Sequence, residues 1–132
     1  MIPKFLFISF FLCFILLSNS CRKNVSHINK DYIGNWSEVD SGGQVCRLSI
    51  IIDPNGYAKA ESKTTLSDCR RYGAHKGKAR ADKQSLKIGT KVYKLIEPPT
   101  AIDAVKVKTD LGEGVSNMRM QLDNLVLFKL LK

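Results

Sequence analysis

Side chains that carry catalysis are scarce in this 132-residue sequence, which has only two histidines, His27 and His75. Ser67 and Asp68 lie near His75, but no nucleophile-elbow glycine pattern surrounds the serine. The sequence also lacks a phosphate-binding loop and a dinucleotide fingerprint. Because a catalytic site needs a positioned base and a group that orients it, we predict no catalytic residues, no enzyme activity and no cofactor.

The sequence has a single long apolar run, Phe5–Leu17, and Lys4 directly precedes it. A helix of this length would span about 20 Å, short of the roughly 30 Å of hydrocarbon in a bilayer. The small polar residues 18–20 are typical of a processing site. The pattern therefore predicts a signal peptide over residues 1–20, with a short uncleaved anchor as the alternative.

The segment that ends at Cys21 resembles the lipobox of bacterial lipoproteins, in which a small residue precedes a lipidated cysteine. Here Ser18 stands where the family usually has leucine, and Leu17 lies one position further back. The resemblance is to the relaxed lipoboxes of Bacteroidetes-type bacteria. It implies a diacylglycerol on Cys21 and a lipid anchor in the cell envelope of a Gram-negative bacterium, at the outer membrane facing the periplasm.

Cysteine usage fits this interpretation. Cys13 would leave with the signal peptide and Cys21 would carry the lipid, so Cys46 and Cys69 remain as one pair. In an oxidising compartment such a pair predicts a disulfide. A zinc site with His75 is the alternative, but the spacing matches no zinc knuckle, so no metal is expected.

The chain has a formal charge of +9, and +8 without Lys4. Such a field favours anionic partners, such as a phosphate-bearing membrane surface or an acidic protein. Nucleic acid is not expected as a partner, because export places the protein away from it.

Residues 21–30 predict a polar, basic tether between the lipid and the folded part. Residues 31–132 predict a single β domain, which we expect to be a monomer.

Beyond the tether, hydrophobic residues alternate with polar ones and turn residues separate the runs. The segments expected as strands are 32–39, 44–53, 57–62, 75–81, 85–88, 91–96, 104–108, 117–122 and 125–131. Turns are expected at 53–56, 89–90 and 123–124, a break at 97–100 and a loop at 111–114. This pattern predicts an all-β fold, a small antiparallel up-and-down barrel or sandwich of about eight strands.

The tripeptide Gly34-Asn35-Trp36 resembles the G-x-W signature of lipocalins and related calycin barrels. The resemblance implies that Trp36 closes one end of a barrel and packs against a later basic side chain. It also implies an interior that holds a small apolar ligand. The alternative is that Trp36 is simply the largest side chain of a small β core.

The segment 75–81 separates small residues from basic ones. One face carries Gly77, Ala79 and Ala81, and the other carries Lys76, Lys78 and Arg80. The small face lets a sheet curve tightly or leaves room for a ligand, and with Trp36 it forms the predicted ligand-binding set. The basic face is either a docking stripe for anions, extended by Lys87, Lys106 and Lys108, or a solvated face that prevents aggregation.

Two functions follow from these patterns. The first is a non-enzymatic, membrane-anchored, lipocalin-like domain that binds a small apolar or anionic ligand. The alternative is a protein-interaction module, such as an enzyme inhibitor or an envelope assembly factor. It would use the basic face and surface loops such as 62–72 and 98–103, and the charge favours an acidic partner.

Overall fold

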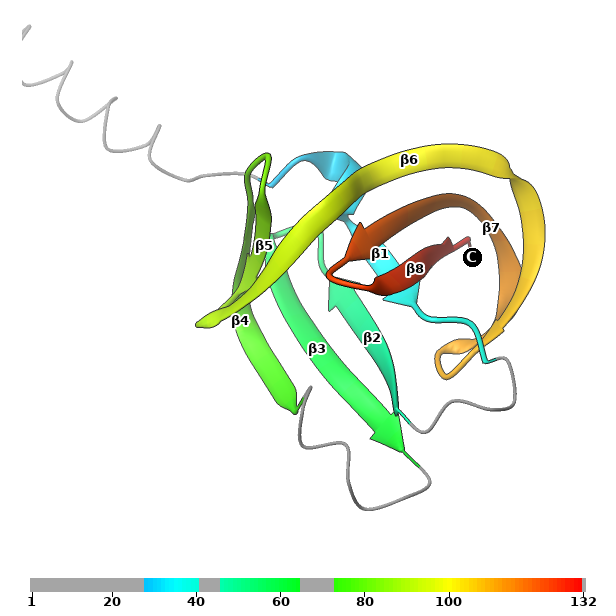
Figure 1. Ribbon diagram of the computed structural model, residues 1–132, viewed down its shortest axis with the longest axis horizontal. Helices are drawn as coiled ribbons and strands as arrows, with labels where there is room; N and C mark the ends of the chain where they lie inside the picture. Colours follow the sequence, from blue (N-terminus) through cyan, green and yellow to red (C-terminus); the bar gives the residue numbers. More distant parts are fainter. Residues whose placement is uncertain (1–27, 41–45, 65–72, 132) are drawn as a thin grey trace, which may run out of the picture.

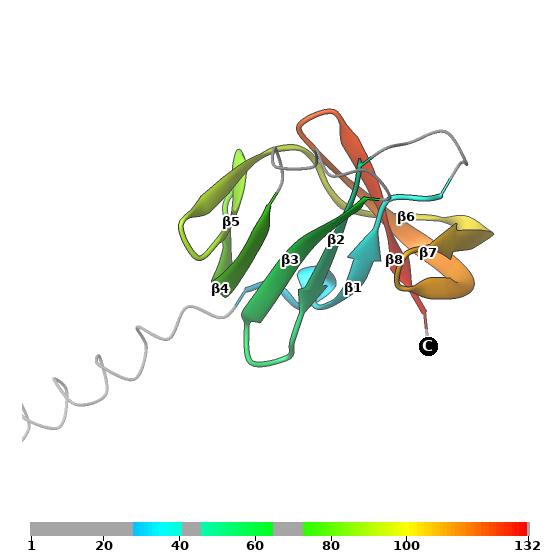
Figure 2. The same cartoon turned by 90° about the horizontal axis from the view of Figure 1, so that it is seen from below.

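A computed structural model of the chain describes residues 28–40, 46–64 and 73–131, and these residues form a closed antiparallel barrel (Figures 1 and 2). Each strand pairs with the next along the chain, and the last pairs with the first. The predicted all-β fold is therefore confirmed. The predicted signal peptide and lipidation site lie outside the described residues, as does all of the tether except residues 28–30.

The barrel has eight strands, preceded by a 3-10 turn, η1, over Lys30–Tyr32. The strands are β1 (Gly34–Ser37), β2 (Cys46–Ile52), β3 (Tyr57–Thr64), β4 (Ala74–Ala81), β5 (Ser85–Ile88), β6 (Lys91–Thr109), β7 (Gly112–Leu122) and β8 (Leu125–Leu130). No helix within the described residues is long and apolar enough to cross a bilayer.

The predicted break at residues 97–100 is wrong, because β6 runs without interruption for 19 residues. The β6–β7 pairing shifts register between Leu95 and Glu97 and again between Glu97 and Thr100, which leaves Pro98 and Pro99 out of the register pairs. On its other side β6 pairs with β5 only as far as Lys94. Proline is tolerated at such bulges and free edges because no ladder hydrogen bond is lost there. The two predicted segments 91–96 and 104–108 are thus one strand, and the predicted loop 111–114 is mostly part of β7.

Two predicted tight turns have the expected backbone. Gly89, between β5 and β6, has a φ of 58°, and Asp123, between β7 and β8, has a φ of 53°. These left-handed conformations favour glycine and tolerate aspartate. Each turn reverses the chain within two residues, which sets the register of the hairpin it joins.

Side chains fill the interior of the barrel. Trp36, Leu48, Ile50, Leu86, Ile88, Met120, Leu122 and Leu127 all have no exposed surface. Zero exposure means that no space the size of a water molecule adjoins these side chains. The interior is therefore a packed core at these positions rather than a ligand cavity.

Tyr93 on β6 has a buried hydroxyl without a hydrogen-bond partner, and the Ser62 hydroxyl is the other such group among the described residues. The Tyr93 side chain is 1% exposed. Burial, with a smaller effect of the Asp123 charge, raises the pKa of Tyr93 to about 12. A buried donor without a partner costs about 1–3 kcal/mol.

Tyr93→Phe should therefore increase the free energy of unfolding at pH 7, by about 1 kcal/mol. The pH dependence should change as well. Below pH 10 the phenol is neutral in both states, whereas between pH 10 and about 12 it ionises only in the unfolded chain, so wild-type stability falls as pH rises. The variant should lose this component, as measured by urea unfolding from pH 8 to 11. Equal stability of both proteins at every pH would contradict an unpaired hydroxyl.

Candidate functional site

At one end of the barrel, Trp36 of β1 and Lys129 of β8 both contact η1. The Lys129 Nζ lies 5.8 Å from the centroid of the Trp36 ring, and the Trp36 Nε1 donates to the Tyr32 carbonyl at 2.8 Å. A Cβ on Gly34 would approach the Lys129 Cε to 2.7 Å, so glycine there leaves room for the lysine stem. This is the contact with a later basic side chain that the G-x-W resemblance implies.

At the same end the start of the described chain lies against the end of β4. Ile28, Asn29 and Tyr32 line a pocket of about 290 Å³ together with residues 79–82. Desolvation, with a smaller effect of the Asp82 charge, raises the pKa of the Tyr32 phenol. We call this pocket the end pocket.

The predicted small face has three different environments. Ala79 is 1% exposed and belongs to the core, Ala81 is exposed, and both line the end pocket. A Cβ on Gly77 would lie 2.6 Å from the Cα of Gly89, so Gly77 allows a close approach of the two backbones. Trp36 is fully buried in the core. The predicted ligand-binding residues are therefore divided between core packing and the end pocket.

The predicted basic residues Lys76, Lys78 and Arg80 are all exposed on β4. The register adds Lys59, which the sequence did not indicate, and places Lys87, the suggested extension, beside these residues. Lys59 of β3 lies directly opposite Lys76, and Lys87 of β5 lies directly opposite Arg80. We call the outer surface formed by Lys59, Lys76, Lys78, Arg80 and Lys87 the basic face.

Like charges placed directly across a sheet destabilise it, so such pairs are usually avoided or compensated. On the basic face, the positive charge of Lys59 is compensated by an ion pair with Glu61, in which Nζ and Oε1 lie 2.8 Å apart. The other four cations form no ion pair with any described residue. This concentration of positive charge is suited to holding an anionic surface or molecule.

Two further residues lie among these cations and were not expected. Tyr57, 46% exposed, is opposite Lys78, and Val92, 53% exposed, is opposite Lys87. Only the strand register could have found them, because they are distant from β4 in sequence. The suggested extension by Lys106 and Lys108 is not part of this surface, since both lie on the β6–β7 hairpin, away from β4 (Figures 1 and 2).

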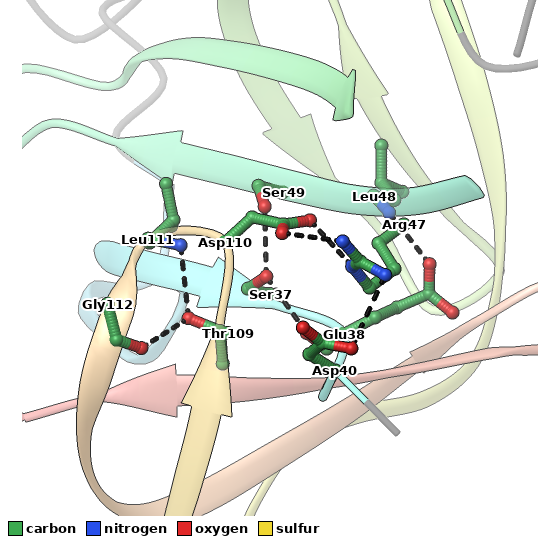
Figure 3. Close-up of polar contacts among 10 residues, drawn as sticks. All are labelled: Ser37, Glu38, Asp40, Arg47, Leu48, Ser49, Thr109, Asp110, Leu111 and Gly112. Carbon is green, nitrogen blue, oxygen red and sulfur yellow. Dashed lines mark hydrogen bonds and ion pairs between the residues drawn. The ribbon is translucent and has the colours of Figure 1, made fainter. Parts of the chain in front are cut away.

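A second polar cluster joins the β6–β7 turn to β1 and β2 (Figure 3). The Arg47 guanidinium donates twice to Asp110, from Nε and Nη2, each at 2.9 Å. Its Nη1 lies 3.4 Å from the Asp40 carboxylate. The side chains of Arg47 and Asp110 are 14% and 12% exposed. This bidentate, largely buried pair holds the turn onto β2.

Glu38 adds a buried carboxylate to this cluster (Figure 3). It is 8% exposed and accepts a hydrogen bond from the Leu48 amide at 2.7 Å. Desolvation raises the pKa of Glu38, although this hydrogen bond and the Arg47 charge oppose the shift. Ser37 and Ser49, with 2.9 Å between their hydroxyl oxygens, complete the buried polar contacts. These groups are occupied with one another, so the cluster is a structural clamp.

The remaining predicted groups lie partly outside the described residues. Cys46, at the start of β2, is disulfide-bonded. Cys69, Ser67 and Asp68 are not described, so the Cys46–Cys69 pairing stays a prediction. Within residues 28–40, 46–64 and 73–131, no cluster of three or more His, Cys, Asp or Glu side chains is placed to hold a metal ion.

Arg47→Met should test the clamp, because it leaves Asp110 partly buried without its cation. We expect the free energy of unfolding to fall by about 3 kcal/mol. The matched control is Arg119→Met, which removes the arginine of the Glu97 ion pair, where the side chains are 48% and 30% exposed. That pair should contribute less than about 1 kcal/mol. Equal losses in chemical unfolding of the two variants would contradict the clamp.

Comparisons with protein-family models, with curated proteins and with solved structures found no match to this chain.

Proposed function

We propose that this protein is a non-enzymatic, lipid-anchored protein of the Gram-negative cell envelope whose barrel binds an anionic partner through the basic face. The observation that carries the proposal is the strand register. It sets Lys59 against Lys76 and Arg80 against Lys87, an arrangement that costs folding stability. Arg80 and Lys87 form no ion pair with any described residue, so a partner's negative charge could offset the repulsion between them.

The packed interior supports a surface function. Trp36, Leu86 and Met120 come from β1, β5 and β7, strands on different sides of the barrel, and each has no exposed surface. A ligand inside the barrel would have to displace such side chains, which would cost packing energy. The outer face needs no rearrangement to meet a partner.

The sequence supports the anchor. The apolar run 5–17 and the lipobox-like segment ending at Cys21 are typical of exported lipoproteins. Neither segment is part of the described structure. The Cys46 disulfide fits an oxidising compartment such as the periplasm.

Combined replacement Lys78→Glu and Arg80→Glu should weaken retention of the detergent-extracted protein on a dextran sulfate resin. Each reversal removes about 1 kcal/mol of attraction, so the double variant should bind about thirtyfold more weakly at low salt. High salt should reduce the difference. Folding should be unaffected or slightly improved, because a glutamate at position 80 would face Lys87.

The matched control is Lys106→Glu with Lys108→Glu, which makes the same change of charge on the β6–β7 hairpin. Both lysines are exposed and lie away from the basic face. The control should be retained nearly as well as the wild type. Equal loss in both double variants would show that only net charge matters, and the basic face would lose its role.

The end pocket supports a second candidate function, the binding of a small ligand. Ala79 and Ala81 line it, which is where the small face of β4 was expected to leave room. Its volume of about 290 Å³ suits a molecule of modest size at the lower limit of ordinary ligand sites.

Ala81→Leu should fill part of the end pocket without disturbing the core, because Ala81 is exposed. Native mass spectrometry of the detergent-extracted protein should then show a small molecule retained by the wild type and lost from the variant. Ala104→Leu, an exposed alanine on β6 outside the pocket, is the control and should retain it. A wild-type protein with no added mass, or equal retention in all three, would contradict this second function.

A further inference from the structure

We infer that the anionic partner of the basic face is the headgroup surface of the membrane that holds the protein, an inference that rests on the proposed lipid anchor. The barrel would then lie with β3, β4 and β5 toward the bilayer rather than extend away from it. Three observations lead to this orientation: the point at which the chain enters the barrel, the direction of the cationic row, and the residues between the cations.

The chain enters the barrel beside the basic face. Ile28 and Asn29 line the end pocket together with Arg80, and the start of the described chain lies next to β4 (Figure 2). Ile28 follows Cys21 by seven residues. Even fully extended, this stretch reaches only about 25 Å. A lipid on Cys21 would therefore keep this end of the barrel close to the headgroups.

The cations continue from that end along the outer surface. Arg80, Lys78 and Lys76 alternate along β4, so the row extends about 13 Å from the end pocket. Lys59 and Lys87 widen it onto the neighbouring strands. Two carboxylates adjoin it: Glu61 is paired with Lys59, and Asp82 accepts hydrogen bonds from the Gln84 and Ser85 amides within its own turn. The surface therefore keeps a clear positive excess.

The residues between the cations suit a lipid interface better than a soluble polyanion. Tyr57 is opposite Lys78 and Val92 is opposite Lys87, and both are about half exposed. Tyrosine prefers the headgroup region because its ring is apolar and its hydroxyl is polar. An acidic glycan or nucleic acid would leave the Val92 side chain without a partner.

Lysine acetylation footprinting on the anchored, full-length protein tests the orientation. The lipidated protein is reconstituted in nanodiscs of phosphatidylcholine alone and in discs that also contain phosphatidylglycerol. Labelling of each lysine is then measured by mass spectrometry. Lys76, Lys78 and Lys87 should be labelled several-fold more slowly in the anionic discs, and Lys106 and Lys108 should be unchanged. Salt should abolish the protection, because attraction to anionic lipids falls off within a Debye length.

Two variants sharpen the test. Arg80→Glu should reduce the protection of Lys76 and Lys87 in the anionic discs, since each cation near such a surface strengthens contact about fivefold. Lys106→Glu, the control, should leave it intact. Equal labelling of Lys76 and Lys106 in anionic discs would overturn the inference, as would equal protection of Lys76 in both kinds of disc.

The experiments can refute the proposed lipid anchor and the inferred orientation independently of each other. The intact mass of the purified protein reports the diacylglycerol, and a mass without it would refute the proposed anchor and with it the tethered orientation. A lipidated protein that binds dextran sulfate through the basic face, but shows no protection in anionic discs, would keep the proposed function. The partner would then be an acidic macromolecule rather than the membrane.

Discussion

The pairing of β1 with both β2 and β8 is the constraint on which the rest of the barrel depends. β1 has only four residues, yet its pairing on two sides turns an open sheet into a closed one. Without it β2 and β8 would become exposed edges, which invite pairing with other chains. Trp36 lies within this short strand, fully buried, and its indole N–H holds η1 against the barrel end. Trp36 therefore contributes both to the closure of the barrel and to the packing of its core.

The described core of this closed barrel is filled by its own side chains. Polar groups are then divided between two roles. Around Arg47, charges meet opposite charges at short range and hold the β6–β7 turn in place. On β4 and its neighbours, charges meet like charges and face solvent. The first arrangement stabilises the fold, whereas the second places like charges at directly opposed strand positions, which costs stability.

Local pattern predicted several features well, because each depends on residues close in sequence. The alternation along β4 separates buried Ala79 from exposed Lys78 and Arg80, as the period of a strand requires. The turn at Asp123 likewise follows from local backbone preference. The continuity of β6 through Pro98 and Pro99 was not predictable, because it depends on register shifts against β7 and on a free edge.

By itself, the sequence determined the class of fold, the two faces of β4 and the positive charge, since these follow from period, turn chemistry and composition. Only the tertiary structure decided which cations face one another. Lys59, Lys76 and Lys87 lie on three strands, and inter-strand register, a long-range property, sets Lys59 against Lys76 and Arg80 against Lys87. The same holds for Arg47 and Asp110, 63 residues apart, which meet because the β6–β7 hairpin folds back onto β2.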